Sequence, residues 1–567
     1  MSLTLSDWSP ALVYVPVGAG IVLVAAHLVP YLLDTHNYRR PAIAGPWINA
    51  LSDAWLSHAA AQGDRSERVH ELHKKYGKFV RLAPNHISIA DPEALQIVYA
   101  HGNGTLKTEF YDAFVSIRRG LFNTRDRTEH TRKRKLVSHV FSQQNVLAFE
   151  PHIRRHVRKF CAKWDERCAL AAKGEDGPDW EARSGQAWFD CLPHYNYLAF
   201  DIIGDLAFGS PFGMIAAQRD SAPMIEHVEG EDTKSAKRTV KHVPAIKILN
   251  DRGDYAASLG VMPPWWRPWA KRVPWYARGN EAVQCLAGLA VAAVSKRLEE
   301  GLPDEEEEEE EEEGAEQEGS KVKKKRTDLL EKLLQGKDEN GAPMGREELT
   351  AEALTQLIAG SDTTSNSSCA ITYYLAANPD KQRKLQAELD KHLSPSTMPI
   401  PATSFENVKS LPYLNACINE GLRLHATSAM GLPRVIPPGM TLEVCGEKFG
   451  PGSVLSVPSF TIHRDQAVWG EDVEAFKPER WLEGGADVQA GVGTGPMAKA
   501  FNPFSYGPRA CVGRNLATME LQIIISSVFA RYEFELLKPS ESLKTREGFL
   551  RKPLDCYVGM KRRAVRN

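Results

Sequence analysis

The sequence lacks an excess of either charge, which argues against a protein that binds nucleic acid. Its 567 residues include 70 Lys and Arg and 72 Asp and Glu, giving a net charge of −2. A polyanion therefore meets no general attraction. The chain is 43% apolar and 25% charged, which is enough for a large core. One large helical enzyme is compatible with this length.

The sequence also lacks a cysteine framework and any motif for a flavin or a nicotinamide. Nine cysteines are scattered irregularly, and no Cys-x-x-Cys occurs. This spacing argues against a disulfide scaffold or a zinc site and favours a reducing compartment. There are no internal repeats. The glycine-rich run 491–495 follows no predicted strand and precedes Pro496, so we interpret it as an insertion and not as a phosphate-binding turn.

Long apolar runs are absent except for one, from Ala11 to Leu33. About 20 such residues are needed to cross a bilayer. Arg39 and Arg40 follow the run, whereas Asp7 precedes it without any Lys or Arg. The positive-inside rule then places the rest of the chain in the cytosol.

We therefore predict an uncleaved membrane anchor with its flank at residues 1–38, followed by a proline-rich hinge at 39–47. A cleaved signal peptide is the alternative, but it would have a basic start and a shorter apolar core. A partly inserted segment is a further alternative, because Pro16 and Pro30 weaken a helix.

The remaining chain, 48–562, is predicted to be one domain that is mainly α with small β-sheets. Helical patterns dominate it, and short strands are predicted near 79–89, 441–457 and the C-terminus. This order is not the alternation of a parallel β/α fold. The acidic and then basic block at about 302–326 is predicted to be a disordered insertion or, alternatively, a docking tail. A basic tail follows at 563–567.

Cys511 lies in a loop, Phe504–Gly513, whose composition suits a metal-bound sulfur. Two glycines permit tight turns, Pro508 fixes the backbone, and Arg509 places a cation near the sulfur. A thiolate held in this way can be the axial ligand of haem iron, a ligation that favours O–O cleavage. The alternative is a buried structural cysteine.

A second unusual stretch interrupts a predicted helix at 347–378, which would be roughly 45 Å long. Its middle, Ala359–Ser365, contains Gly, Ser and Thr, which cost helix stability or bend the helix. Such a helix is expected to open a groove; the alternative is a polar kink.

Both stretches resemble the cytochrome P450 superfamily, in its Phe-x-x-Gly-x-Arg-x-Cys-x-Gly loop and its Ala/Gly-Gly-x-Asp/Glu-Thr groove. The resemblance implies the P450 fold and a haem b cofactor whose iron is bound by Cys511, with Phe504 and Gly513 around it. It implies that Gly360 leaves room for O2, that Thr363 hydrogen-bonds it and that Asp362 relays protons from solvent.

Further motifs of the same superfamily occur in the expected order. Glu420-x-x-Arg423 and the later Arg480 resemble its Glu-x-x-Arg and Arg cluster, which has a structural role behind the haem. Arg134, Arg434 and Arg509 match positions that bind the haem propionates. His130 stands where the family often has Trp. Lys and Arg residues beside Arg134 form either a basic docking face or an ordinary solvated face: Arg132, Lys133 and Lys135.

A closer resemblance is to the fungal benzoate 4-monooxygenases. The stretches that carry it are His101–Gly104, Phe110–Ile117, Gly120–Arg127, Thr427–Arg434 and Thr545–Pro553. The resemblance implies substrate contacts among Phe110, Tyr111, Phe114, Ala359, Thr427, Ser428, Met430 and Phe549. The partner of a substrate carboxylate stays open among Tyr111, Ser116, Thr427, Ser428, Arg118 and Arg119.

The sequence thus predicts a haem-thiolate monooxygenase that converts benzoate to 4-hydroxybenzoate with O2. Electrons would come from a separate NADPH-cytochrome P450 reductase, on the endoplasmic reticulum membrane, with the catalytic domain in the cytosol. The alternatives are another small aromatic, phenolic or lipid-like substrate, direct use of hydrogen peroxide, or a non-catalytic haem sensor. A sensor has no need of the proton relay that Asp362 and Thr363 imply.

Overall fold

The computed structural model describes residues 10–33, 43–229, 237–300, 328–336, 341, 343–393, 402–483 and 495–563. The predicted acidic insertion at 302–326 lies outside the described residues. The same holds for most of the glycine-rich run, of the hinge before residue 43, and of the C-terminal tail.

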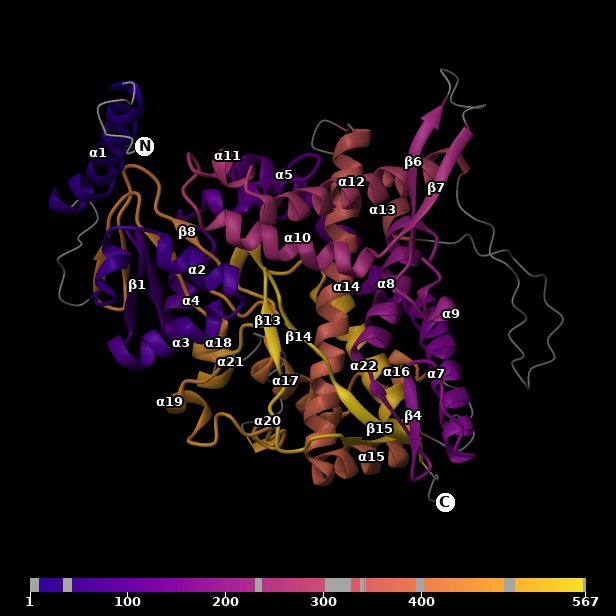
Figure 1. The fold of residues 1–567 in the computed structure, drawn as a ribbon. Coiled ribbons are helices and arrows are strands. Elements are labelled where there is room, and N and C mark those ends of the chain that lie inside the picture. Colours follow the sequence, from indigo (N-terminus) through magenta and orange to yellow (C-terminus); the bar gives the residue numbers. More distant parts are fainter. Residues whose placement is uncertain are drawn as a thin grey trace, which may run out of the picture.

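Helices form most of the molecule (Figure 1). The longer ones are α1 (Pro10–Leu32), α2 (Ala54–Gln62), α3 (Arg65–Tyr76), α4 (Pro92–Tyr99), α5 (Arg127–Val140), α7 (Glu150–Ala172), α8 (Leu192–Phe208), α10 (Ala245–Gly260), α12 (Pro274–Glu300), α14 (Arg346–Ala377), α15 (Pro379–His392), α17 (Pro412–Leu424) and α22 (Arg514–Arg531). The shorter ones are α6 (Gln143–Leu147), α9 (Met214–Ala217), α11 (Arg267–Ala270), α13 (Leu329–Gln335), α16 (Phe405–Val408), α18 (Ser459–Ile462), α19 (Gln466–Trp469), α20 (Arg480–Glu483) and α21 (Pro496–Ala500), with 3-10 turns η2 (Trp47–Ala50), η3 (Glu109–Phe114) and η4 (Gly507–Arg509).

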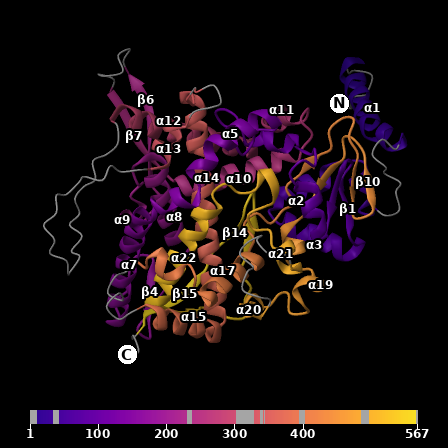
Figure 2. The same cartoon turned by 180° about the vertical axis from the view of Figure 1, so that it is seen from behind.

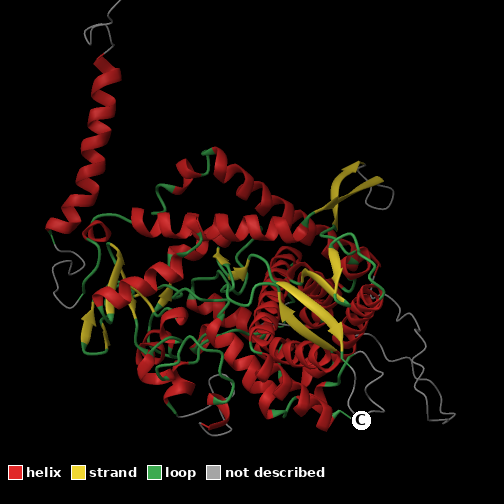
Figure 3. Cartoon of the chain, turned by 60° about the horizontal axis from the view of Figure 1, so that its bottom comes forward, coloured by secondary structure: helices red, strands yellow, loops and turns green. Residues whose placement is uncertain are grey.

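Strands are short and gather in small sheets (Figure 3). They are β1 (Phe79–Ala83), β2 (His86–Ile89), β3 (Leu106–Lys107), β4 (Trp180–Arg183), β5 (Gln186–Asp190), β6 (Ala222–Glu229), β7 (Lys237–Val243), β8 (Arg434–Val435), β9 (Leu442–Val444), β10 (Glu447–Phe449), β11 (Val454–Ser456), β12 (Tyr532–Leu536), β13 (Thr545–Glu547), β14 (Arg551–Pro553) and β15 (Tyr557–Arg562). Five pair in the order β1-β2-β11-β8-β3 and four in the order β12-β15-β5-β4. The prediction of a mainly α fold with small sheets is confirmed.

Helix α14 runs through the middle of the molecule, with α8 and α22 packed along it (Figures 1 and 2). It ends at Ala377 because Asn378 leaves the helical conformation and Pro379 begins α15. The predicted helix at 347–378 is therefore confirmed to within a residue at each end. The main core includes residues of α14 such as Leu375 together with Trp164, Phe189 and Phe534, whose rings pack on one another.

Helix α1 projects away from the rest of the molecule (Figure 3). Its large apolar side chains are exposed, as at Ile21 and Val22. Within the part of the chain that the structure describes, no helix meets the length and apolarity required to cross a membrane. The predicted anchor at 1–38 is thus not confirmed.

Candidate active site

The Cys511 loop is shaped by backbone constraints at its turn. Gly507 has a φ of 73°, and a Cβ there would lie 1.8 Å from the carbonyl oxygen of Tyr99, so only glycine fits. The turn η4 follows, and the N–H of Cys511 donates to the carbonyl of Phe504 at 2.8 Å. Helix α22 begins three residues after the cysteine, so its N-terminus favours a thiolate. The loop thus fixes the direction of one sulfur.

The Cys511 side chain is exposed even though protein surrounds the loop. Desolvation by these surroundings raises the pKa of the thiol. The backbone N–H of Gly513 and the cations of Arg514 and Arg134 act in the opposite direction. An accessible thiol whose polar and cationic neighbours favour its anion suits a metal ligand better than an inert core cysteine.

A group of cations lies beside this loop without acidic partners; we call it the basic cluster. It comprises Lys107, His130, Arg134, Arg434 and Arg509. Each cationic side chain donates to neutral oxygens: Arg134 to the Ala510 carbonyl at 2.7 Å, Arg434 to the Tyr111 hydroxyl at 2.8 Å, Arg509 to the Thr124 carbonyl at 2.5 Å and Lys107 to the Phe122 carbonyl. Among the described residues none of the five forms an ion pair with a carboxylate.

The fold forces these cations together. Lys107 in β3 stands directly opposite Arg434 in β8, and like charges in this position repel. Burial and three neighbouring arginines lower the pKa of Lys107 well below its usual value. Burial and the same cations lower the pKa of His130 to about 3, so that this imidazole is neutral. The cluster therefore fits a ligand that brings carboxylates, as haem does with its two propionates.

The middle of α14 exposes one small residue and two polar side chains. Ala359 is exposed, and Asp362 and Thr363 are partly buried. The hydroxyl of Thr363 donates to the Ala359 carbonyl at 2.7 Å. Gly360 has a different role from the predicted one: a Cβ there would lie 2.7 Å from Ile203 of α8, so its lack of a side chain serves helix packing.

Asp362 is an acid tuned toward neutral pH. Burial, with Asp254 adding to it, raises its pKa to about 6, while Lys552 and Arg252 act against this. A carboxyl with this pKa exchanges protons readily near neutrality. Asp362 and Thr363 are adjacent on α14, so a carboxyl with this pKa stands beside a hydroxyl.

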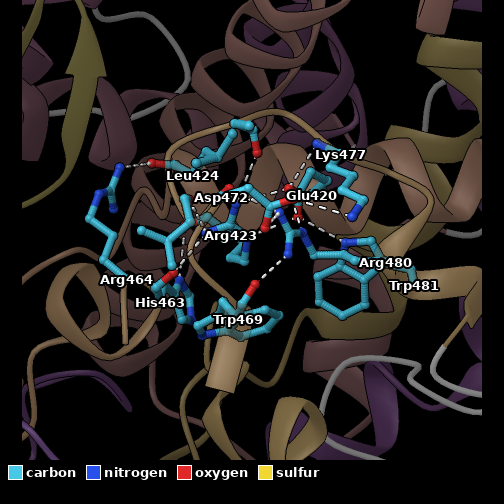
Figure 4. A network of polar contacts seen from close by, with 12 residues as sticks. Glu420, Arg423, Leu424, His463, Arg464, Trp469, Asp472, Lys477, Arg480 and Trp481 are labelled. Atoms are coloured by element: carbon cyan, nitrogen blue, oxygen red, sulfur yellow. Dashed lines mark hydrogen bonds and ion pairs between the residues drawn. The ribbon is translucent and has the colours of Figure 1, made fainter. Parts of the chain in front are cut away.

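Glu420, Arg423 and Arg480 meet in a buried network (Figure 4). Glu420 accepts from Arg423 Nε at 2.8 Å and from Arg480 Nε at 3.0 Å, and both arginines also bind backbone carbonyls. Trp481 Nε1 donates to the same carboxylate at 3.0 Å. The network joins α17 to the segment 463–481, which precedes the cysteine loop, and every charge in it has a partner.

Comparison with known proteins identifies the family. The family model described as "Cytochrome P450" matches residues 46–560. The chain belongs to the cytochrome P450 family. Family members use thiolate-ligated haem, and the accessible thiol and basic cluster fit this group.

Named relatives of this cytochrome P450 are fungal. "Benzoate 4-monooxygenase bphA" of Aspergillus niger is 46% identical over 559 residues, 98% of this chain and 99% of the relative. "Cytochrome P450 monooxygenase hepC" of Aspergillus oryzae is 30% identical over 506 residues, 87% of each chain. "Pisatin demethylase" of Fusarium vanettenii is 26% identical over 541 residues, 93% of this chain and 91% of the relative. The chain is therefore a P450 monooxygenase.

Most of the predicted substrate residues lie in one aromatic cluster, which we call the aromatic wall. It consists of the buried Phe110, Tyr111, Phe114 and Met430, with Phe122 and Phe549 packed against them. The Phe114 and Phe549 rings are 4.8 Å apart at their centroids. Thr427 is buried, Ser428 is partly buried, and Ala359 lies apart on α14.

The structure separates the residues proposed for the substrate carboxylate. Arg118 and Arg119 are exposed and line an open groove of about 570 Å³ together with Lys107 and Lys133, outside the aromatic wall. The Tyr111 hydroxyl already accepts from Arg434. The Ser116 hydroxyl is buried and has no partner.

A basic docking face on α5 is not what the structure shows. Lys133 is 1% exposed and lies 3.7 Å from Glu348. Arg132 is paired with Glu129 and Glu348. Of the three predicted residues only Lys135 is exposed, so the expected surface does not form.

Sequence reasoning missed two buried arginines beside the aromatic wall, Arg65 and Arg252. Arg252 occupies the apolar stripe Leu249, Arg252, Ala256, Leu259 of α10, all four of which are buried. A lone cation at a stripe position of an amphipathic helix was the available signal.

A further feature that spacing did not predict is a cysteine triad away from the Cys511 loop. Cys191, Cys369 and Cys556 are buried with their sulfurs within 4.8 Å of one another. Cys369 lies two turns beyond Asp362 along α14, so the triad is distinct from the haem ligand.

Proposed function

We propose that this P450 monooxygenase hydroxylates benzoate at the para position. The likeness to the Aspergillus niger benzoate 4-monooxygenase, which extends over nearly the whole of both chains, carries the proposal. The aromatic wall supports it, since a planar ring needs apolar aromatic contacts. Another small aromatic, phenolic or lipid-like substrate is the alternative that the experiment below distinguishes.

The proposed site has three parts. Cys511 binds the haem iron, and Arg134, Arg434, Arg509 and neutral His130 donate to the haem carboxylates. Haem, when bound, supplies the activation of O2 and its transfer to the ring. Thr363 places its hydroxyl at the middle of α14. The adjacent Asp362, which lies near Lys552 and Arg252, passes protons to this position.

Electrons are proposed to come from a separate NADPH-cytochrome P450 reductase, because no flavin or nicotinamide motif occurs in the chain. We place both proteins at the endoplasmic reticulum membrane, with the catalytic domain in the cytosol. The exposed apolar side chains of α1 support membrane association of that helix. Fractionation of cells that express the full chain tests this placement.

Carbon monoxide difference spectra and turnover test the function. The reduced protein should give the thiolate-type Soret band with carbon monoxide, and benzoate should shift the ferric spectrum and yield 4-hydroxybenzoate with a reductase. A normal carbon monoxide spectrum without any benzoate response or product would leave the enzyme class and overturn the substrate. Cys511→Ala should abolish the thiolate band; its survival would overturn the ligand assignment.

A further inference from the structure

Arg252 is a buried cation with unused hydrogen-bonding capacity. It lies on the inner face of α10 and is 7% exposed. Its Nη2 donates to the Phe114 carbonyl at 3.0 Å, whereas its Nε is buried without a partner. In the described residues it forms no ion pair.

A single bond to a backbone carbonyl does not account for an arginine at this place. Burying a charge costs several kcal/mol unless partners compensate for it. Burial lowers the pKa of Arg252 to about 10, and Asp362 is the group that opposes this. The pKa of Asp362 is itself raised, which favours its neutral form, so Asp362 is a weak counter-ion.

Two other arginines near the wall differ from Arg252. The partly buried Arg267 donates to the carbonyls of Met262, Glu109 and Gly260, so all three of its nitrogens hold a loop. Arg65 is stabilised by the nearby Glu547 carboxylate. Arg252 alone of these three combines burial, an unpartnered nitrogen and the absence of a strong anion.

The position of Arg252 defines what an additional partner would look like. Its guanidinium lies 6.0 Å from the Phe114 ring centroid, and Phe114 packs edge to face against Phe549 and Phe122. The same face of α10 contacts Phe110, where a Cβ on Gly260 would lie 2.7 Å from that ring. A cation beside an aromatic surface suits a planar ring that carries one carboxylate.

A second polar group lies close to the same wall along the chain. The Ser116 hydroxyl is buried, has no partner among the described residues and lies two residues beyond Phe114, whose carbonyl accepts from Arg252. A carboxylate accepts several hydrogen bonds, so this neutral donor is a suitable companion to the guanidinium.

We propose that Arg252 binds the carboxylate of the aromatic acid substrate and so selects acids over neutral aromatic rings. The inference rests on the proposed function for the identity of the ring, and adds the residue that recognises its charge. Arg252 acts in binding, so it positions the ring while Asp362 and Thr363 serve the chemistry.

The test compares benzoate with benzamide, its neutral counterpart, by spectral titration of the haem-loaded protein. Wild type should bind benzoate far more tightly than benzamide. Arg252→Gln should weaken benzoate binding about 100-fold, as expected for loss of a charge-assisted buried hydrogen bond, and leave benzamide within about twofold. Arg252→Lys keeps the charge and should retain part of the benzoate affinity. In turnover, the KM for benzoate should rise more than kcat falls.

Lys247→Met is the matched control, since it removes a cation from the exposed face of the same helix. It should leave both titrations unchanged. Wild-type benzoate affinity in an Arg252→Gln protein that gives a normal carbon monoxide spectrum would overturn the assignment and leave the proposed function intact. Failure of wild type to bind benzoate would instead overturn the proposed function. If Arg252→Gln does not incorporate haem, equal wild-type affinities for benzoate and benzamide would refute charge recognition without any variant.

Discussion

At the scale of single residues, hydroxyl groups on α14 show how one helix serves both stability and chemistry. Thr350, Thr355, Ser361, Thr363 and Thr372 each donate to the carbonyl four residues before them. Thr350, Ser361 and Thr372 are buried, whereas Thr355 and Thr363 are partly exposed. Thr363 directly follows Asp362 and lies one turn beyond the exposed Ala359, and the proposed function therefore assigns proton positioning to it.

Replacing Thr363 by Ala should separate reductant consumption from product formation. Without the hydroxyl, protons from Asp362 arrive without guidance, and more reduced oxygen should leave as hydrogen peroxide. The ratio of 4-hydroxybenzoate to NADPH consumed should fall several-fold. Ser361→Ala is the control, because it removes an equivalent hydroxyl from a fully buried position that donates to the Leu357 carbonyl. Equal coupling in wild type and Thr363→Ala would contradict the role.

Glu520 on α22 provides a pH-dependent test of buried carboxyls. Burial raises its pKa to about 7, and among the described residues its side chain accepts a hydrogen bond only from the Thr364 hydroxyl, at 2.7 Å. Because the folded-state pKa lies above the unfolded value, the acid costs no stability below about pH 4 and an increasing amount as pH rises toward 7. Glu520→Gln should remove that cost and stabilise the protein at pH 8 by up to about 3 kcal/mol.

Denaturant unfolding of wild type and Glu520→Gln at pH 8 and pH 5 measures this effect. The advantage of the variant should be largest at pH 8 and should shrink as pH falls. Glu541→Gln is a useful comparison, since that exposed carboxylate pairs only with surface lysines. An advantage of the same size at both pH values would show that the gain has another origin.

At the scale of elements, the sequence predicted the helices and strands that are determined by residues close together in the chain. The end of α14 follows from Pro379, and the paired strands β1 and β2 follow from an apolar run with a turn at Pro84 and Asn85. The basic cluster was only partly predictable. Lys107 joins Arg434 through strand pairing between segments more than 300 residues apart, which no local pattern reveals. The cysteine triad has the same origin, since Cys369 of α14 meets Cys191 before α8 and Cys556 before β15, three segments far apart in the sequence.

The error at Gly360 has a related cause. A glycine in a helix shows that space is needed, but not on which side. The structure assigns that space to Ile203, because α8 packs closely on α14 at this turn. Arg252 is the opposite case: its place on the apolar stripe of α10 was visible in the sequence, whereas its missing partner became visible only in the fold.

The segment preceding the cysteine loop depends on the Glu420 network. Glu420 is fully buried and accepts from two arginines, Trp481 and the backbone N–H of Lys477. Glu420→Gln keeps the shape but directs an NH2 group at these donors, removes the counter-ion of Arg423 and leaves Arg480 with only the partly exposed Asp472. Loss of one partner from such a network costs about 3–5 kcal/mol. We expect loss of haem incorporation, measured as haem per protein after purification.

Glu406→Gln controls for the loss of a carboxylate as such. Glu406 pairs with Lys409 at 2.6 Å on the surface, where a pair contributes little. Its haem content and unfolding midpoint should equal those of wild type. Full haem loading of Glu420→Gln would show that the cysteine loop binds haem without the network.

At the scale of the whole molecule, the described chain divides into a packed body and a projecting helix. The body begins at Ile43, where Ala44 bridges to Val80 and accepts from the N–H of Arg81 at 2.9 Å. Soon afterwards the buried Asn49 donates its Nδ2 to the Arg81 carbonyl at 2.9 Å. These bonds fasten the start of the body to the edge of the five-stranded sheet. Helix α1 instead presents apolar side chains to solvent.

Deleting residues 1–42 should therefore remove membrane association without affecting the site. The truncated protein should keep the carbon monoxide difference spectrum, and its benzoate dissociation constant should stay within about twofold, because α1 projects away from the body that holds the site residues. It should move from the membrane pellet to the supernatant, since an exposed apolar helix favours the bilayer interface. Deleting 1–50 is the contrasting variant: it also removes Ala44 and Asn49, leaves the Arg81 backbone unpaired and should lower the unfolding midpoint. A 1–42 deletion that still sediments with membranes would locate the membrane contact on the body rather than on α1.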